Sequence, residues 1–225
     1  MRWGLISDIH SNAPALRAVL DDLERLGVER VLCAGDVVAY YPFPTETIEM
    51  MAEARIISIQ GNHDRAVLNV NPSMMNPQAA DAVLWTASVL SANNRRLLSV
   101  MPPNTTVRSD RRAMSVYHGS PRDPLEYVYE EDASASLLRM ARCSVLVLGH
   151  THVPYAKRFP DGLIVNPGSV GQPRDGDPRA SYSIVDTEEG SVENHRVEYD
   201  LEAMERRFER TNLPRWLLER LRDGI

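Results

Sequence analysis

Three short apolar runs alternate with two amphipathic segments near the start of the chain, and this order restricts the fold more than any other feature. The runs that suit buried strands are 3–7, 30–35 and 55–60. Apolar side chains recur at helical spacing in residues 11–27 and 44–54, and Gly27 predicts the end of the first helix. Because helices alternate with strands in this way, a parallel or mixed sheet with covering helices is favoured.

The remainder of the chain predicts further strands and helices. Residues 77–100 read as helical, with a break at the pair Asn93 and Asn94. The other expected elements are a short helix at 133–142 and strands at 114–119, 144–150, 163–169, 180–186 and 191–199. The last three of these strands are expected in a second, more antiparallel sheet. The tail, residues 201–223, is amphipathic and predicts a helix that is broken near Pro214.

From this order of elements we expect a fold of the α/β or α+β class. Two mixed β-sheets would face each other, and helices would cover the outer face of each sheet, which gives a four-layer α-β-β-α sandwich. The length of 225 residues suits one large domain, and no linker or repeat divides it, so residues 1–225 are expected to form a single domain. The apolar positions of the tail, among them Leu213, Trp216 and Leu217, are expected to pack on that domain.

Composition limits the classes of function. The formal net charge of −6 argues against a broad basic surface for polymeric nucleic acid, although bound cations would still attract a phosphate. No apolar run approaches the roughly 20 residues of a membrane span, and the start MRWGLISDIH lacks the pattern of a secretory signal. Cys33 and Cys143 adjoin apolar runs and are expected to be free thiols. The sequence therefore predicts a soluble, cytoplasmic protein.

Polar residues gather where the predicted strands end. Five of the six histidines lie at these ends, and His195 is the exception, in an alternating strand that suggests a structural role. The motifs in chain order are D-I-H at 8–10, G-D at 35–36, G-N-H-D at 61–64, H-G at 118–119 and G-H-T-H at 149–152. Because open α/β sheets place their sites at the carboxyl ends of strands, we expect these side chains to converge on one crevice.

Seven of these side chains form a set of nitrogen and oxygen donors without thiolates. They are Asp8, His10, Asp36, Asn62, His118, His150 and His152. Such donors suit Mn, Fe, Zn, Ni or Co, and they fit a calcium cage or a structural zinc site poorly. Seven ligands are more than one tetrahedral ion can bind. They suit two divalent metal ions that share a bridging carboxylate. Two such ions, about 3.5–4 Å apart, can clamp a phosphate and generate a hydroxide nucleophile.

The five motifs, in this order, resemble those of the calcineurin-like metallophosphoesterase superfamily over about residues 3–170. The resemblance implies a sandwich of two β-sheets flanked by helices. It implies that Asp36 bridges two metal ions. The implied remaining ligands are Asp8, His10 and His152 for one ion and Asn62, His118 and His150 for the other.

The resemblance also implies roles beyond metal binding. His63 would lie over the phosphate and assist the leaving oxygen, with Asp64 as its orienting partner. The segments 35–46, 118–127 and 166–182 are similar to a bacterial branch described as predicted phosphoesterases or diadenosine-tetraphosphatase-like proteins.

One departure from the family pattern bears on the substrate. Protein phosphatases of the superfamily carry an Asp-Arg pair shortly after G-D, and here the stretch 38–41 reads Val-Ala-Tyr-Tyr, which argues against that role. Arg122 and Arg174 lie in polar loops and are candidates to bind the phosphate instead, because a guanidinium matches phosphate geometry. Tyr40 and Tyr41 either stack on a base or cover the core.

We therefore expect a dimetal hydrolase of small phosphomonoesters or phosphodiesters, with a nucleotide among the possible substrates. The narrower alternatives are dinucleoside polyphosphate hydrolysis and protein dephosphorylation. A different class of function is a non-catalytic scaffold, such as the retromer subunit that shares this superfamily's fold but has a degraded site. The seven candidate ligands are all present here, which favours the enzyme.

Overall fold

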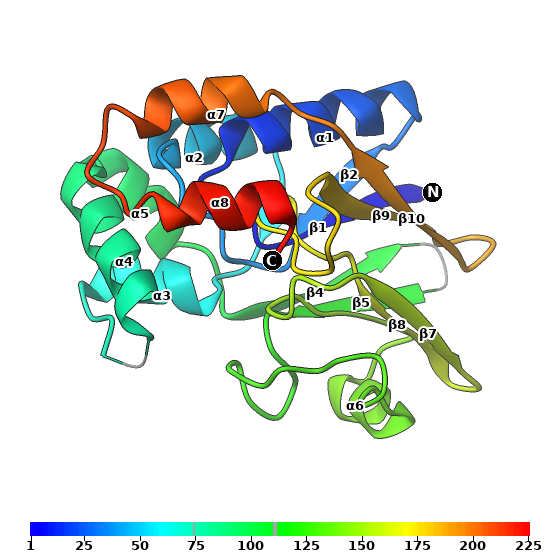
Figure 1. Ribbon diagram of the computed structural model, residues 1–225. Coiled ribbons are helices and arrows are strands. Elements are labelled where there is room, and N and C mark those ends of the chain that lie inside the picture. The colour runs from blue at the N-terminus through cyan, green and yellow to red at the C-terminus, as the bar shows by residue number, and fades with distance from the viewer. Residues whose placement is uncertain (74, 110–111) are drawn as a thin grey trace.

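The computed structural model describes residues 1–73, 75–109 and 112–225. Two five-stranded sheets face each other, and helices lie on their outer faces (Figure 1). The predicted four-layer sandwich of two mixed sheets is therefore confirmed.

The first sheet has the strand order β10-β9-β1-β2-β3. Its strands are β1 (Arg2–Ile6), β2 (Arg30–Cys33), β3 (Ile57–Ser58), β9 (Ala180–Asp186) and β10 (Ser191–Val197). The three strands from the start of the chain run parallel, as predicted, and β9 pairs antiparallel with both β1 and β10. The expectation that β9 and β10 belong to the second sheet is wrong. The side chains of β9 are buried on both faces up to Val185, which suits a strand inside a sheet.

The second sheet has the strand order β4-β5-β6-β8-β7. Its strands are β4 (Asn104–Ser109), β5 (Arg112–Tyr117), β6 (Val145–Val147), β7 (Tyr155–Phe159) and β8 (Gly162–Asn166). The central strands β5, β6 and β8 are parallel, and the edge strands β4 and β7 are antiparallel to their neighbours. The sequence did not predict β4 and β7. Both are short edge strands whose mixed polar sequences, NTTVRS and YAKRF, lack a buried apolar run.

Helices cover the outer face of the first sheet and one end of the molecule. They are α1 (Ala13–Arg25), α2 (Pro44–Glu53), α3 (Asn62–Asn69), α4 (Pro77–Val89), α5 (Ala92–Ser99), α7 (Leu201–Phe208) and α8 (Trp216–Asp223). On the opposite side, α6 (Ala135–Ala141) contacts β6 and β8 (Figure 1). Among the described residues, no helix has the length and apolar character to cross a membrane.

The helical stretch at 77–100 breaks earlier than the sequence predicted. The interruption lies at Leu90 and Ser91, and both Asn93 and Asn94 belong to α5. The hydroxyl of Ser91 accepts a hydrogen bond from the backbone nitrogen of Asn94 at 3.2 Å and so caps the new helix. The break near Pro214 in the tail is confirmed, because α7 and α8 flank this residue.

Strand β1 contributes side chains to two hydrophobic cores, one on each face of its sheet. Trp3 and Leu5 point into the core between the two sheets, where they meet residues of β5, β6 and β8. Ile6 points to the other face and packs with α1 residues such as Leu16. This alternation is the pattern that a strand buried on both faces must show.

Truncation of the inter-sheet core is expected to destabilise the fold strongly. Leu5 is 0% exposed, so Leu5→Ala should lower the free energy of unfolding by about 2–5 kcal/mol through lost burial and a residual cavity. Urea denaturation measures this change. The matched control is Leu84→Ala, since Leu84 is 45% exposed and should lose little. Equal losses in both variants would contradict the assigned position of β1.

Candidate metal centre

The parallel pairing of β1 with β2 brings the first two motifs side by side. The backbone nitrogen of Asp8 donates to the carbonyl of Gly35 at 3.0 Å, and that of His10 donates to the carbonyl of Asp36 at 3.0 Å. The two loops thus continue the strand pairing beyond the end of the sheet. Both acids consequently emerge at the same edge.

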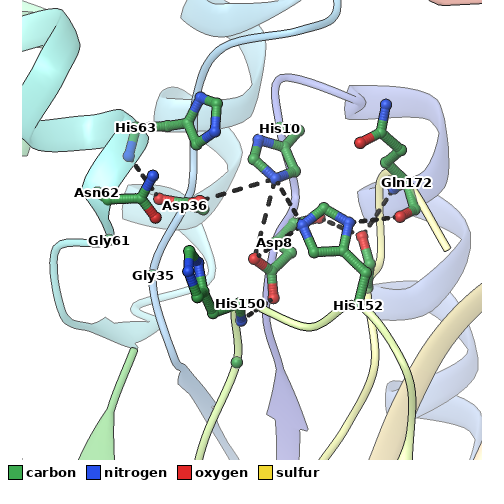
Figure 2. Close-up of polar contacts among 12 residues, drawn as sticks. Asp8, His10, Gly35, Asp36, Gly61, Asn62, His63, His150, His152 and Gln172 are labelled. Carbon is green, nitrogen blue, oxygen red and sulfur yellow. Dashed lines mark hydrogen bonds and ion pairs between the residues drawn. The ribbon is translucent and has the colours of Figure 1, made fainter. Parts of the chain in front are cut away.

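Asp8, His10 and His152 form one group of facing donor atoms (Figure 2). Nε2 of His152 lies 3.3 Å from Oδ1 of Asp8, and Nε2 of His10 lies 3.9 Å from the same oxygen. The two imidazole nitrogens are 3.2 Å apart. All three residues are buried, so the donors face each other away from solvent.

Asp36, His118 and His150 form the second group, and the side chain of Asn62 adjoins it. Nε2 of His118 lies 3.2 Å from Oδ2 of Asp36, 3.1 Å from Nδ1 of His150 and 2.9 Å from Oδ1 of Asn62. His118 follows β5 and His150 follows β6, which are parallel neighbours in the second sheet. Each sheet thus contributes donors from the carboxyl ends of its parallel strands.

Asp36 lies between the two groups. Its Oδ2 is 3.2 Å from Nε2 of His118 in the second group and 3.8 Å from Nε2 of His10 in the first. Its other oxygen, Oδ1, accepts a hydrogen bond from the backbone nitrogen of His63 at 2.9 Å. That bond holds the carboxylate in place, and the free edge of Oδ2 faces both sets of donors.

Three of the histidines are oriented by backbone carbonyls. Nδ1 of His10 faces the carbonyl of Val38 at 3.3 Å, and Nδ1 of His118 faces the carbonyl of Ala34 at 2.8 Å. Nδ1 of His152 faces the carbonyl of Gln172 at 2.5 Å. A carbonyl only accepts hydrogen bonds, so each of these Nδ1 atoms carries a proton and each Nε2 points into the cluster. This is the arrangement that metal-binding histidines require.

The backbone is strained where the donors emerge. Residues of the two groups with positive φ, the left-handed region, are Asp8 (52°), His10 (49°), Asp36 (52°), His150 (68°) and His152 (61°). Non-glycine residues in this region store of the order of 1–3 kcal/mol each and concentrate at functional sites. Such strain at five of the seven candidate ligands points to selection for geometry over stability.

Electrostatics favour the unprotonated, metal-competent forms of the donors other than His118. Burial lowers the pKa of His118, but the carboxylate of Asp36 outweighs it and raises this pKa to about 9, so a metal ion would have to displace a proton there. Burial favours the neutral acid, yet the nearby His118 and His63 hold the pKa of Asp36 well below its usual value. Burial lowers the pKa of His10 well below its usual value and that of His150 to about 3. At pH 7 the carboxylate is therefore charged, and these two imidazoles are neutral.

The donor set fits two divalent metal ions. Oδ1 of Asp8 and Nε2 of His150 are buried and accept no hydrogen bond from any residue that the structure describes. The lone pairs of His10 and His152 face each other at 3.2 Å and repel unless a positive charge lies between them. Imidazole nitrogens together with carboxylate oxygens match Mn, Fe, Co, Ni and Zn.

His63 and Asp64 belong to the first turn of α3, which follows β3. The ring of His63 lies edge-on to that of His10 at 4.9 Å, and its Nδ1 is buried without a partner. Asp64 does not orient it, contrary to expectation. The Asp64 carboxylate accepts hydrogen bonds from the backbone nitrogens of Gly61 and Val38, both at 3.0 Å. Asp64 therefore caps the helix and ties it to the loop after β2.

A cavity of about 440 Å³ opens onto the donor groups. Of the two arginines proposed from the sequence, Arg174 lines this cavity and Arg122 does not. Arg122 is instead paired with Glu126, its Nε lying 3.1 Å from Oε2, so the expectation that it binds the phosphate is not met. Two residues that the sequence did not suggest also line the cavity, namely Tyr127 and Arg220.

Both tyrosines after β2 are buried and belong to the core that includes the tail helices, as one of the two suggested roles predicts. Tyr40 lines the cavity, and its ring lies 4.7 Å from that of His63. Tyr41 is 0% exposed and packs in the core with the tail helices. His195 lies outside the centre and stacks on Tyr182, in agreement with its structural interpretation.

Residues 1–190 match the calcineurin-like phosphoesterase superfamily domain. The chain belongs to the calcineurin-like phosphoesterase superfamily. The chain is 34% identical to an uncharacterised protein of Methanocaldococcus jannaschii, with 96% of each covered. It is also 26% identical to phosphodiesterase YfcE of Escherichia coli, over 85% of this chain and 91% of that one.

A solved metallophosphoesterase from Sphaerobacter thermophilus is similar over the whole of this calcineurin-like phosphoesterase. The identity is 36%, the TM-score is 0.86, and 100% of this chain and 99% of that chain are covered. Family, fold and relatives together make the chain a metal-dependent phosphoesterase with two groups of residues that can each hold a metal ion.

The shared carboxylate predicts a strict requirement for glycine at position 61. A Cβ on Gly61 would lie 2.0 Å from Oδ1 of Asp36, so Gly61→Ala should displace this side chain and release bound metal. Mass-spectrometric metal analysis after dialysis measures the loss. Gly27→Ala is the control, because Gly27 has φ +69° and open space around it; it should cost about 1–2 kcal/mol and no metal. Unchanged metal content in Gly61→Ala would contradict the shared position of Asp36.

Proposed function

We propose that this chain hydrolyses small phosphate esters, phosphodiesters above all, with two divalent metal ions as cofactors. The observation that carries the proposal is the position of Asp36 between two complete donor groups at the base of one cavity. Relatives named phosphodiesterase support the preference for diesters, and phosphomonoesters are the second candidate class.

The ligand assignment follows the two donor groups. Asp8, His10 and His152 would hold one ion. Asn62, His118 and His150 would hold the other, with Asp36 shared between them. The donor atoms of each group lie close to one another, and their side chains are buried. Both observations support this division. When bound, the two ions would neutralise the phosphate and lower the pKa of a coordinated water.

His63 is the residue proposed to act on the substrate rather than on the metal. Burial lowers its pKa to about 4, so the ring is neutral at pH 7 and offers one N–H donor and one acceptor. Its unpartnered Nδ1 and its position in the cavity wall suit a hydrogen bond to the phosphate or the leaving oxygen. That bond would strengthen as negative charge develops on the oxygen.

Arg174 is the residue proposed to hold the phosphate from the side of the loop after β8. One terminal nitrogen, Nη2, donates to Oε1 of Gln172 at 2.9 Å, while Nε is buried without a partner. The backbone carbonyl of the same Gln172 accepts a hydrogen bond from Nδ1 of His152. One residue thus aligns both a candidate ligand and a candidate phosphate-binding group.

The size of the cavity favours a small substrate over a protein or a nucleic acid polymer. A volume of about 440 Å³ lies in the range of small-molecule sites, about 300–1,000 Å³. Tyr40 and Tyr41 are buried where protein phosphatases of the superfamily carry their arginine. Manganese as the metal, a cytoplasmic location and one domain over residues 1–225 stay predictions.

Substitution of the shared ligand tests the metal centre. Asp36→Asn keeps the shape of the side chain but removes the charge that both groups face, so at least one of two ions should be lost. Metal analysis and calorimetric titration with Mn measure stoichiometry and affinity. Two ions bound with native affinity would refute the bridging role.

Substitution of His63 separates chemistry from metal binding. His63→Gln should retain both metal ions and lose about 100-fold or more in kcat, which is the scale of a proton-transfer or oxyanion contact. The assay is hydrolysis of bis(p-nitrophenyl) phosphate with Mn, Ni, Zn or Mg. His195→Gln, outside the centre, is the control and should keep its activity. Full activity of the His63 variant would remove this residue from the mechanism.

A further inference from the structure

A second arginine reaches the cavity from a helix near the C-terminal end of the chain. Arg220 belongs to α8, outside residues 1–190 that match the family, and it lines the same cavity as Arg174. Both arginines are half-buried. The wall that faces the donor groups therefore contains a charged side chain that the common part of the superfamily does not supply.

The guanidinium of Arg220 is held in place through its Nε atom. Its Nε donates to the carbonyl of Ile225 at 2.8 Å, and the group lies over the ring of Trp216 at 5.7 Å. Within the described residues, its two terminal nitrogens have no protein partner. The fork of N–H groups that binds phosphate best is thus left for a ligand.

The helix that carries Arg220 is fixed relative to the metal ligands. The hydroxyl of Tyr41 donates to the carbonyl of Leu217 at 3.3 Å, and Nε2 of Gln172 donates to that hydroxyl at 3.0 Å. The backbone nitrogen of Gly176 donates to the carbonyl of Gly224 at 2.9 Å. Because Gln172 also contacts His152 and Arg174, one chain of contacts links α8 to the centre.

The positive charge of the two arginines in the cavity favours binding of an anion. In the described part of the chain, Arg174 takes part in no ion pair, and the terminal nitrogens of Arg220 contact no Asp or Glu side chain. Asp36 is the one acid among the described lining residues. Arg174 and Arg220 line this cavity together with Tyr40. Two like charges that share a partly buried wall repel each other unless a ligand neutralises them.

We propose that Arg220 and Arg174 form an anion subsite beside the metal ligands, and that the substrate carries a second phosphate group next to the one that is hydrolysed. This inference rests on the proposed function. The donor groups at the base of the cavity would take the scissile phosphate, and the two guanidinium groups would take its neighbour. Arg220 is thereby a specificity-determining residue that selects polyphosphate esters over simple ones.

A matched pair of nucleotides tests the subsite. AMP and ADP differ by one phosphate, and both are used as competitive inhibitors of bis(p-nitrophenyl) phosphate hydrolysis at constant free metal. ADP should inhibit at about tenfold lower concentration than AMP, which is the effect of one added charge-assisted contact. Arg220→Gln should reduce this preference to about twofold or less.

Two variants of the same helix control the experiment. Arg222→Gln removes an exposed arginine that is paired with Glu205 outside the cavity, and it should keep the full preference for ADP. Arg220→Lys keeps the charge without the fork and should retain an intermediate preference. Thermal unfolding of each variant shows that α8 remains folded.

The outcomes separate this inference from the proposed function. Equal preference for ADP in the native chain and in Arg220→Gln, or no preference in the native chain, would overturn the subsite. If no metal supports hydrolysis, calorimetric titration of the metal-loaded protein with AMP and ADP replaces the inhibition assay. A preference for ADP that is lost in Arg220→Gln would then support the subsite, although the proposed hydrolysis had failed.

Discussion

The parallel pairing of β1 with β2 is the constraint on which the rest of the structure depends. It directs Asp8 and Asp36 to the same edge and lets their loops continue the pairing through the carbonyl of Gly35. The second sheet repeats the device with β5 and β6, which deliver His118 and His150. Since the two sheets pack face to face, the carboxyl ends of both sets of parallel strands converge. The donor groups are therefore a property of the strand topology.

The centre is assembled at the expense of local stability. Five candidate ligands have left-handed backbone conformations, and buried nitrogens face one another across about three ångströms. Surrounding contacts hold this arrangement in place, for example the carbonyl of Ala34 on His118 and the backbone nitrogen of His63 on Asp36. A cation shared by the donors would relieve the repulsion between them, and metal binding would then stabilise the folded chain.

The sequence revealed the parts that depend on local pattern. Motifs at strand ends identified the residues that come together in the structure. A polar residue directly after a buried strand lies at the edge of the sheet, where the other strand ends also lie. Pairing between strands that are distant along the chain has no comparable signal in the sequence. For that reason β9 was assigned to the wrong sheet. Arg122 and Arg174 lie in similar polar loops, yet Arg122 pairs with Glu126, whereas Arg174 pairs with no carboxylate among the described residues. Arg220 reads as one more polar residue of an amphipathic helix, and only tertiary packing brings it to the cavity.

The candidate metal ligands and the arginine that α8 contributes to the proposed phosphate subsite come from different parts of the chain. The candidate metal ligands all lie within the residues shared across the superfamily, while Arg220 lies in a segment beyond them. A change in this terminal segment would therefore leave the candidate ligands of the hydrolytic centre in place. Divergence of substrate choice then needs no mutation at the ligands, whose strained geometry tolerates little variation. Under the proposed role of Arg220, this helix would set the selectivity, while the part of the chain that matches the family supplies the hydrolytic centre.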